Sequence, residues 1–168
     1  VRMFGTHLDI TEHKREENYT QARLRLANLA YQRLDITTLM RAMLDEAEAL
    51  TDSQIGFFHF VDDDQNTITL QAWSTNTLKT LCTAEGQGQH YPVAQAGVWA
   101  DGIRDGQPRI YNDYAVLPDR RNLPDGHAPV IRLISLPIKR NNLIVAALGV
   151  GNKPRDYTQH DLDIVQRL

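Results

Sequence analysis

The segment Ile55-Gly56-Phe57-Phe58-His59-Phe60-Val61 is apolar at almost every position, and the polar run Asp62-Asp63-Asp64-Gln65-Asn66 follows it. A short run that is apolar on both alternating sides predicts a strand that is covered on both faces. Residues 67–73 then resume a two-residue period, so the chain must turn and form a hairpin. The residues expected on one face of this second strand are Ile68, Leu70 and Ala72.

A second hairpin is predicted from residues 132–138 and 143–150, which alternate across the polar connection Lys139-Arg140-Asn141-Asn142. Residues 109–112 predict a short strand before it. Between the two hairpins, residues 94–105 predict one helix, which Gly106 and Pro108 should end because these residue types occur where helices stop. The apolar residues expected on this helix are Val98, Trp99 and Ile103.

Three more helices are predicted. Residues 11–33 place apolar residues at steps of three and four among many charges, so this amphipathic helix either packs on its own domain or forms a coiled-coil linker. Asp35 is the expected N-cap of a helix over residues 37–50, and Thr158 with Asp161 predicts a capping box for the last helix. The element order predicts the α+β class: an antiparallel sheet with flanking helices and a long N-terminal linker helix.

The composition excludes several classes of protein. The chain has 168 residues, of which 42% are hydrophobic and 23% charged, and no window approaches the ~18 apolar residues of a membrane span. A net charge of −3 and a pI near 6.1 argue against nucleic-acid binding. The single cysteine, Cys82, excludes an internal disulfide and fits a cytoplasmic location. We expect a fragment, because the chain begins at Val1 and stops inside a predicted helix.

The first residues resemble the end of a PAS domain. The string Gly5-Thr6-His7-Leu8-Asp9-Ile10-Thr11-Glu12-His13-Lys14-Arg15 is similar to a last PAS strand that ends at Asp-Ile-Thr-Glu and continues into a charged signalling helix. The resemblance implies a PAS end over residues 1–16 and a connecting amphipathic helix over residues 17–36.

Residues 37–168 resemble a GAF domain in their element order and in four local strings. These strings are Ala96-Gly97-Val98-Trp99, Ile110-Tyr111-Asn112-Asp113-Tyr114, Ile134-Ser135-Leu136-Pro137-Ile138 and Gly149-Val150-Gly151-Asn152-Lys153. The resemblance implies a GAF-like fold and a regulatory module of a bacterial signal-transduction protein, either a sensor histidine kinase or a cyclic-di-nucleotide signalling enzyme. Catalysis would then lie in a linked output domain, and this fragment would not be an enzyme.

The last string is similar to the Asn-Lys-Phe-Asp-Glu motif of cyclic-nucleotide GAF domains. The matching residues are Asn152, Lys153, Tyr157 and Asp161. Leu162 stands where the motif has Glu, which argues against cyclic-nucleotide binding. The resemblance implies that Lys153 and Asp161 form a structural ion pair.

Enzymatic and metal chemistry find weak support in the sequence. A methionine sulfoxide reductase of the GAF type needs an attacking and a resolving thiol, and this chain has only Cys82. Covalent bilin attachment needs a Cys followed by His, whereas Thr83 follows Cys82. His59, His90 and His127 show no short metal-ligand spacing, so no metal site is predicted.

The predicted ligand site lies between residues 73 and 132, where two long irregular stretches, 74–93 and 115–130, could form binding loops. By resemblance to GAF pockets, the candidate ligand-binding residues are Trp73, Tyr91, Trp99, Asp113, Tyr114 and Arg132. The aromatic residues would form walls and the charged pair would orient the ligand. The alternative is that Trp99 and Tyr114 are core residues and that Asp113 caps a turn.

The leading functional hypothesis is a cytoplasmic sensory domain that binds a small molecule of unknown identity and relays the signal through its terminal helices. A ligand can do this only if it favours one of two packings of those helices. The expected partners are the ligand, linked PAS and output domains, and a second copy in a parallel dimer bundle, without nucleic acid or membrane contact. The alternatives are a ligand-free dimerisation or spacer module and a methionine sulfoxide reductase.

Overall fold

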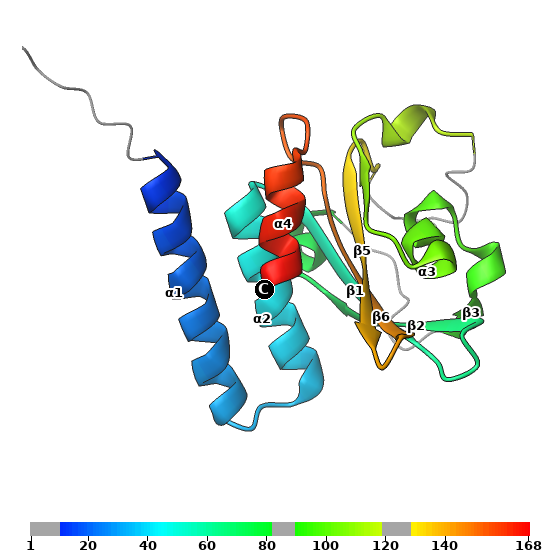
Figure 1. Ribbon diagram of the computed structural model, residues 1–168, viewed down its shortest axis with the longest axis horizontal. Coiled ribbons are helices and arrows are strands. Elements are labelled where there is room, and N and C mark those ends of the chain that lie inside the picture. The colour runs from blue at the N-terminus through cyan, green and yellow to red at the C-terminus, as the bar shows by residue number, and fades with distance from the viewer. Residues whose placement is uncertain (1–10, 82–89, 119–128) are drawn as a thin grey trace, which may run out of the picture.

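A six-stranded antiparallel sheet, in the order β3-β2-β1-β6-β5-β4, organises the chain (Figure 1). The computed structural model describes residues 11–81, 90–118 and 129–168. The strands are β1 (Ile55–Val61), β2 (Thr67–Trp73), β3 (His90–Pro92), β4 (Arg109–Tyr111), β5 (Leu133–Arg140) and β6 (Leu143–Gly151). The predicted hairpins are β1–β2 and β5–β6, and β1 also pairs with β6, so the two hairpins join at the centre of the sheet.

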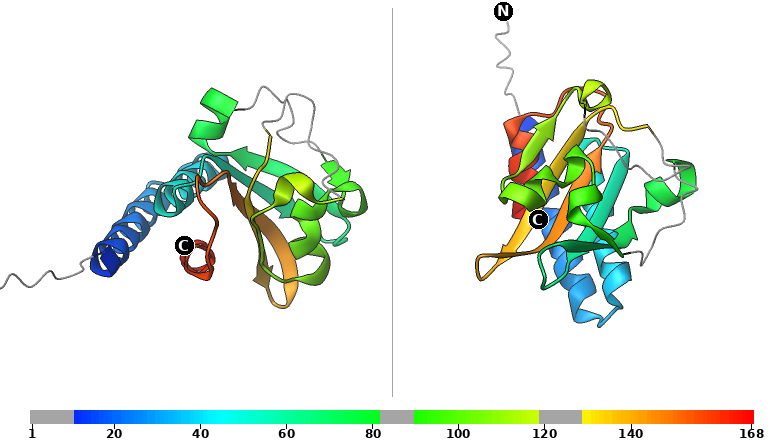
Figure 2. Two further views of the ribbon diagram at one scale, coloured as in Figure 1. Left: turned by 90° about the horizontal axis from the view of Figure 1, so that it is seen from above. Right: turned by 90° about the vertical axis from the view of Figure 1, so that its right-hand side faces the viewer.

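The two faces of the sheet carry different kinds of cover. The helices α1 (Thr11–Tyr31), α2 (Ile36–Thr51) and α4 (Gln159–Arg167) lie on one face, with α1 on the outer side of α2 (Figures 1 and 2). We call this the helical face. The opposite face, which we call the loop face, is covered by short turns and one short helix. These are η2 (Val93–Gln95), η3 (Val98–Ala100), α3 (Asp101–Asp105) and η4 (Tyr114–Val116).

The predicted helix ends and the second turn are present. The Asp35 carboxylate accepts a hydrogen bond from the backbone N–H of Thr38 at 2.9 Å, and Thr158 and Asp161 form a reciprocal capping box. The β5–β6 turn is tighter than predicted, because β5 extends to Arg140. Asn141 and Asn142 alone form the turn, with positive φ of 50° and 65°, a conformation that asparagine tolerates better than most residues.

The single helix predicted over residues 94–105 is wrong. The chain is extended at Ala96 and Gly97, so it forms η2, η3 and α3 instead. The Arg104 guanidinium donates to the carbonyl oxygens of Val93, Ala96 and Gly97, so a side chain satisfies acceptors that a continuous helix would have used. The helix does end where predicted, with Gly106 in the left-handed region at φ 69°.

The face predicted for Ala72 is also wrong. The β1–β2 register pairs Phe58 with Ala72 but His59 with Leu70, which leaves Gln71 as an extra residue in β2. This bulge reverses the alternation, so Ala72 packs on the helical face and Trp73 turns onto the loop face. The stretch 74–93, predicted to be irregular, contains β3 and a π-helical turn, η1 (Thr77–Leu81).

Two apolar clusters fill the space on either side of the sheet, one under the loops and one under α2 and α4. Gly149 lies directly opposite Phe57 in the β1–β6 pair. A Cβ at Gly149 would lie 2.1 Å from a ring carbon of Phe57, so only glycine lets the ring lie flat across β6. Phe57 can therefore reach inward among the aromatic residues of the loop face.

Candidate functional site

Four rings meet on the loop face. Phe57 and His59 come from β1, Trp73 from the end of β2, and Trp99 from η3; together we call them the aromatic cluster. Trp99 stacks on His59 with ring centroids 4.7 Å apart, and Phe57 contacts His59, Trp73 and Trp99 edge to face at 5.4–6.4 Å. The Ser135 hydroxyl donates to the Trp99 carbonyl oxygen at 2.6 Å, which fixes η3 above the sheet. These rings form a rigid apolar wall.

His59 is the ionisable member of the aromatic cluster, and only 3% of it is exposed. Burial lowers its pKa to about 3, because a charged imidazolium has no water around it at this position. His59 is therefore neutral at physiological pH. It adds a polar ring to the wall without adding a charge.

Tyr114 lies beside this wall, in η4, and is 1% exposed. Its hydroxyl has no hydrogen-bond partner among residues 11–81, 90–118 and 129–168, which is unusual for a buried Tyr. Burial, together with the negative charge of Asp101, raises the pKa of Tyr114 to about 12. The neighbouring Tyr111 donates to the Asp101 carboxylate at 2.9 Å, so Tyr111 is partnered and Tyr114 remains a buried neutral donor and acceptor.

The structure brings together three of the six predicted ligand-binding residues. Trp73, Trp99 and Tyr114 belong to the apolar cluster of the loop face. Phe57 and His59 belong with them but were not among the predicted residues. Their two-residue spacing, which places both on the same side of β1, was visible in the sequence, but the run gave no indication of which side faced the loops.

Of the other three predicted residues, Asp113 and Arg132 lie apart from this group. Asp113 is exposed, and its side chain makes no capping hydrogen bond at the start of η4. Arg132 pairs with Asp156 at 2.9 Å and extends toward solvent. Tyr91 pairs with Ile68 through the β3 backbone, and its side chain lies outside the described residues. Cys82 and His127 also lie outside them.

The helical face contains a buried pair of charged groups. Lys153 Nζ lies 2.5 Å from Asp161 Oδ1, with the two side chains only 11% and 7% exposed. The other Asp161 oxygen accepts hydrogen bonds from the Thr158 backbone and hydroxyl. Although burial acts in the opposite direction, these partners lower the pKa of Asp161. The predicted ion pair is therefore present.

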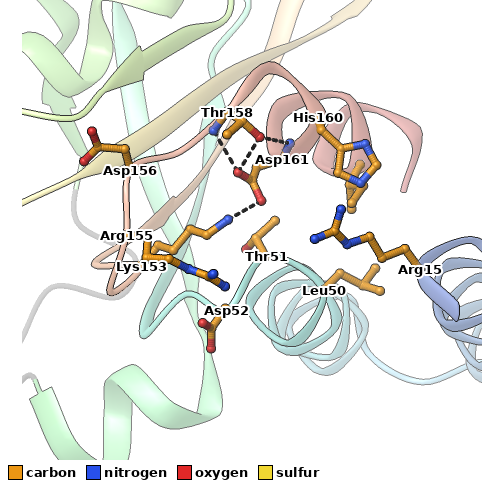
Figure 3. Close-up of a pocket in the computed structure, with 11 residues that line it drawn as sticks. Arg15, Leu50, Thr51, Asp52, Lys153, Arg155, Asp156, Thr158, His160 and Asp161 are labelled. Carbon is orange, nitrogen blue, oxygen red and sulfur yellow. Dashed lines mark hydrogen bonds and ion pairs between the residues drawn. The ribbon is translucent and has the colours of Figure 1, made fainter. Parts of the chain in front are cut away.

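A pocket of about 370 Å³ opens beside this ion pair, where α1, the end of α2 and the start of α4 meet (Figure 3). We call it the three-helix pocket. Its lining residues include the basic side chains Arg15, Lys153, Arg155 and His160 and the carboxylates Asp52, Asp156 and Asp161. No single stretch of sequence contains these residues, which explains why sequence reasoning missed the pocket.

The α1 helix is held to the rest of the domain by contacts in its two halves. The Tyr19 hydroxyl donates to the Arg167 carbonyl oxygen at 2.6 Å, and the Arg167 guanidinium lies 4.3 Å from the Tyr19 ring centroid. Arg25 forms a bidentate pair with Glu46 of α2 at 2.6 and 2.8 Å. The N-terminal half of α1 therefore contacts the end of α4 directly.

Glu48 is a buried acidic residue of α2 that is 6% exposed and lies close to Gly56 and Ser74. Within the described ranges its Oε1 atom has no hydrogen-bond partner. Burial raises its pKa to about 7, while the Ser74 hydroxyl opposes and Asp45 adds to this rise. Glu48 therefore changes protonation near neutral pH.

Among the described residues, no group of three or more His, Cys, Asp or Glu side chains is arranged to hold a metal ion. None of the helices in this part of the chain combines the length and apolar character needed to cross a bilayer.

Comparisons with known proteins agree with this architecture. The family model of the GAF domain matches residues 33–168. The chain is 32% identical over 169 aligned residues to the methyl sulfide methyltransferase-associated sensor of Methanosarcina acetivorans. That alignment covers 95% of this chain, which spans 16% of the length of this curated relative.

Solved structures support the fold. The GAF domain of a phosphoenolpyruvate-protein phosphotransferase from Coxiella burnetii superposes with a TM-score of 0.71 at 10% identity, covering 88% of this chain and 86% of that one. A methyl-accepting chemotaxis protein, residues 122 to 287, gives a TM-score of 0.67 at 14% identity, covering 84% and 88%. At these identities the likeness concerns the fold alone.

Proposed function

Because the chain belongs to the GAF domain family over residues 33–168, we propose that it is a sensory domain that binds a small molecule on the loop face and relays binding to its terminal helices. The sensor-named relative and the chemotaxis-protein structure support a regulatory rather than a catalytic role. The ligand would lie against the aromatic cluster and the Tyr114 hydroxyl.

The observation that carries the proposal is the Tyr114 hydroxyl, a buried polar atom without a partner in the described segments. Leaving such a group unsatisfied costs about 1–3 kcal/mol, which a ligand acceptor or donor would recover. The rings of the aromatic cluster are uncharged, with His59 neutral, and the Asp101 carboxylate disfavours a second negative charge near Tyr114. This setting favours a neutral, partly aromatic ligand with one hydrogen-bonding group facing Tyr114.

The relay would pass through the contact between α1 and α4. Tyr19 and Arg167 join these helices. β1 carries Phe57 and His59 of the aromatic cluster and pairs with β6, the strand that precedes α4. A ligand that bound one arrangement of α1 and α4 better than another would shift the population between them. Signal direction then follows from which arrangement the ligand favours.

The larger context is proposed from the sequence. Residues 1–16 would end a PAS domain, and a sensor kinase or cyclic-di-nucleotide output domain would follow in a longer cytoplasmic protein. A second copy would pair along the terminal helices as a parallel dimer. The exposed apolar side chains of α1 favour such pairing, since Leu24 and Tyr31 are 53% and 89% exposed.

Native mass spectrometry of the purified chain tests the ligand and the dimer together. We expect a species heavier than the bare chain by one small molecule, and a dimer at raised concentration. Tyr114→Phe keeps the ring and removes only the hydroxyl, so it should lose the added mass. Tyr31→Phe is the matched control, since Tyr31 is exposed on α1, and should retain it.

A bare wild-type mass, together with unchanged stability in Tyr114→Phe, would contradict ligand binding and favour the ligand-free spacer. The stacking of Trp99 on His59 is the observation behind that alternative, because these rings already contact one another.

A further inference from the structure

The three-helix pocket contains two arginines and a histidine that form no ion pair with the other described residues that line it. Arg15 comes from α1, Arg155 from the connection between β6 and α4, and His160 from the first turn of α4. Neither arginine forms an ion pair with any residue of the described ranges. In Figure 3 their guanidinium groups point toward one another across Thr51, with the His160 ring above Arg15.

The carboxylates of the pocket do not balance these cations. Both oxygens of Asp161 are occupied, one by Lys153 and the other by Thr158. Asp156 binds Arg132, and the Asp52 side chain turns away from the space between the two arginines (Figure 3). Within the described part of the chain, two guanidinium groups and an imidazole therefore face a space into which none of the carboxylates lining the pocket is directed.

We propose that the three-helix pocket binds the phosphate group of a small organic phosphate. Guanidinium groups offer paired N–H donors that match phosphate oxygens, and two of them suit a doubly charged anion better than a single carboxylate. The volume of about 370 Å³ is at the lower end of the range for small-molecule sites, so it accommodates the organic part of the ligand beside the phosphate.

The site joins two parts of the domain that are distant in sequence. Arg15 belongs to α1, whereas Arg155 and His160 belong to the segment that forms α4. A phosphate held between them bridges α1 to the body of the domain, close to the Tyr19–Arg167 contact. The site is separate from the loop-face ligand and does not depend on it.

Isothermal titration of the full chain tests the proposal, with inorganic phosphate and glycerol 3-phosphate as probes and sodium chloride at equal ionic strength as the blank. Arg15→Gln and Arg155→Gln each remove one guanidinium and keep a polar chain. Arg140→Gln is the matched control, because Arg140 is exposed near the β5–β6 turn. Each pocket variant should weaken binding about tenfold, and the control should bind like wild type.

Hydrogen exchange supplies the second readout. Saturating phosphate should slow exchange of the α1 backbone in wild type and leave it unchanged in Arg15→Gln. Absence of binding at matched ionic strength, or equal affinity of Arg155→Gln and Arg140→Gln, would overturn the site. Binding that survives Arg15→Gln undiminished would overturn the bridge to α1. Glycerol 3-phosphate should bind more tightly than inorganic phosphate, and the reverse order would exclude an organic ligand.

Discussion

The loop face and the helical face differ in the state of their buried polar groups. On the loop face, burial keeps His59 uncharged and Tyr114 protonated, and rings supply most of the contacts. On the helical face, Lys153 and Asp161 remain charged and are paired at 2.5 Å. The loop face thus offers the neutral hydroxyl of Tyr114, whereas the helical face offers the guanidinium groups of Arg15 and Arg155. For this reason we assign a neutral ligand to the loop face and a phosphate to the helical face.

Removal of the Lys153–Asp161 ion pair should have the largest effect on the free energy of unfolding. Lys153→Met leaves a buried carboxylate with only its Thr158 contacts, which should lower the free energy of unfolding by about 3–5 kcal/mol. Urea denaturation measures the loss, with Lys14→Met as the control at an exposed lysine. The double variant Lys153→Met, Asp161→Asn should recover part of the stability. Equal stability of Lys153→Met and Lys14→Met would show that the helical face does not depend on the pair.

Acid should destabilise the loop face through His59. The folded pKa of His59 is about 3 against 6.5 in the unfolded chain, so the unfolded state binds more protons below pH 6.5. Stability should therefore fall as the pH decreases from 6.5, by about 3 kcal/mol at pH 4. His59→Leu should lack this dependence, whereas His13→Gln, at an exposed histidine, should retain it. If the free energy of unfolding of His59→Leu and of wild type changed with pH in the same way, the result would count against a buried neutral imidazole.

Glu48, on the helical face, should respond in the opposite pH direction to His59. Its folded pKa of about 7 lies above the ordinary 4.5, so the folded state binds more protons and loses stability as the pH rises from 4.5 through 7. Glu48→Gln should raise the free energy of unfolding at pH 8 by on the order of 2 kcal/mol and leave it little changed at pH 4. Thermal denaturation at both pH values measures this. Glu17→Gln should show neither change, and a destabilised Glu48→Gln at pH 8 would refute the assignment.

Local sequence patterns predicted most of the elements correctly. The bounds of β1 and β2, the Asp35 cap and the Thr158–Asp161 capping box are all present, because each depends on residues within one turn or one strand. The errors arose where distant contacts override local preference. The long side chain of Arg104 stabilises a broken chain at Ala96, and the Gln71 bulge is visible only once β2 pairs with β1.

The candidate sites were less predictable than the fold. Trp73, Trp99 and Tyr114 were predicted through resemblance and aromatic character. Phe57 and His59 could be predicted only from knowledge of which side of β1 faces the loops. The three-helix pocket depends on Arg15 and Arg155, which are far apart in the sequence and lie together only after α1 packs against α2 and α4. No spacing rule connects such residues.

The Tyr19–Arg167 contact also determines how the domain would carry mechanical load. The two residues are 148 positions apart in the sequence, yet their hydrogen bond is 2.6 Å long. Tension applied between residues 11 and 168 would act first on this single contact and on the Glu16–Arg167 pair beside it. The strand pairing of the sheet lies outside these contacts, so α1 would separate from α4 before any strand was pulled from its neighbour.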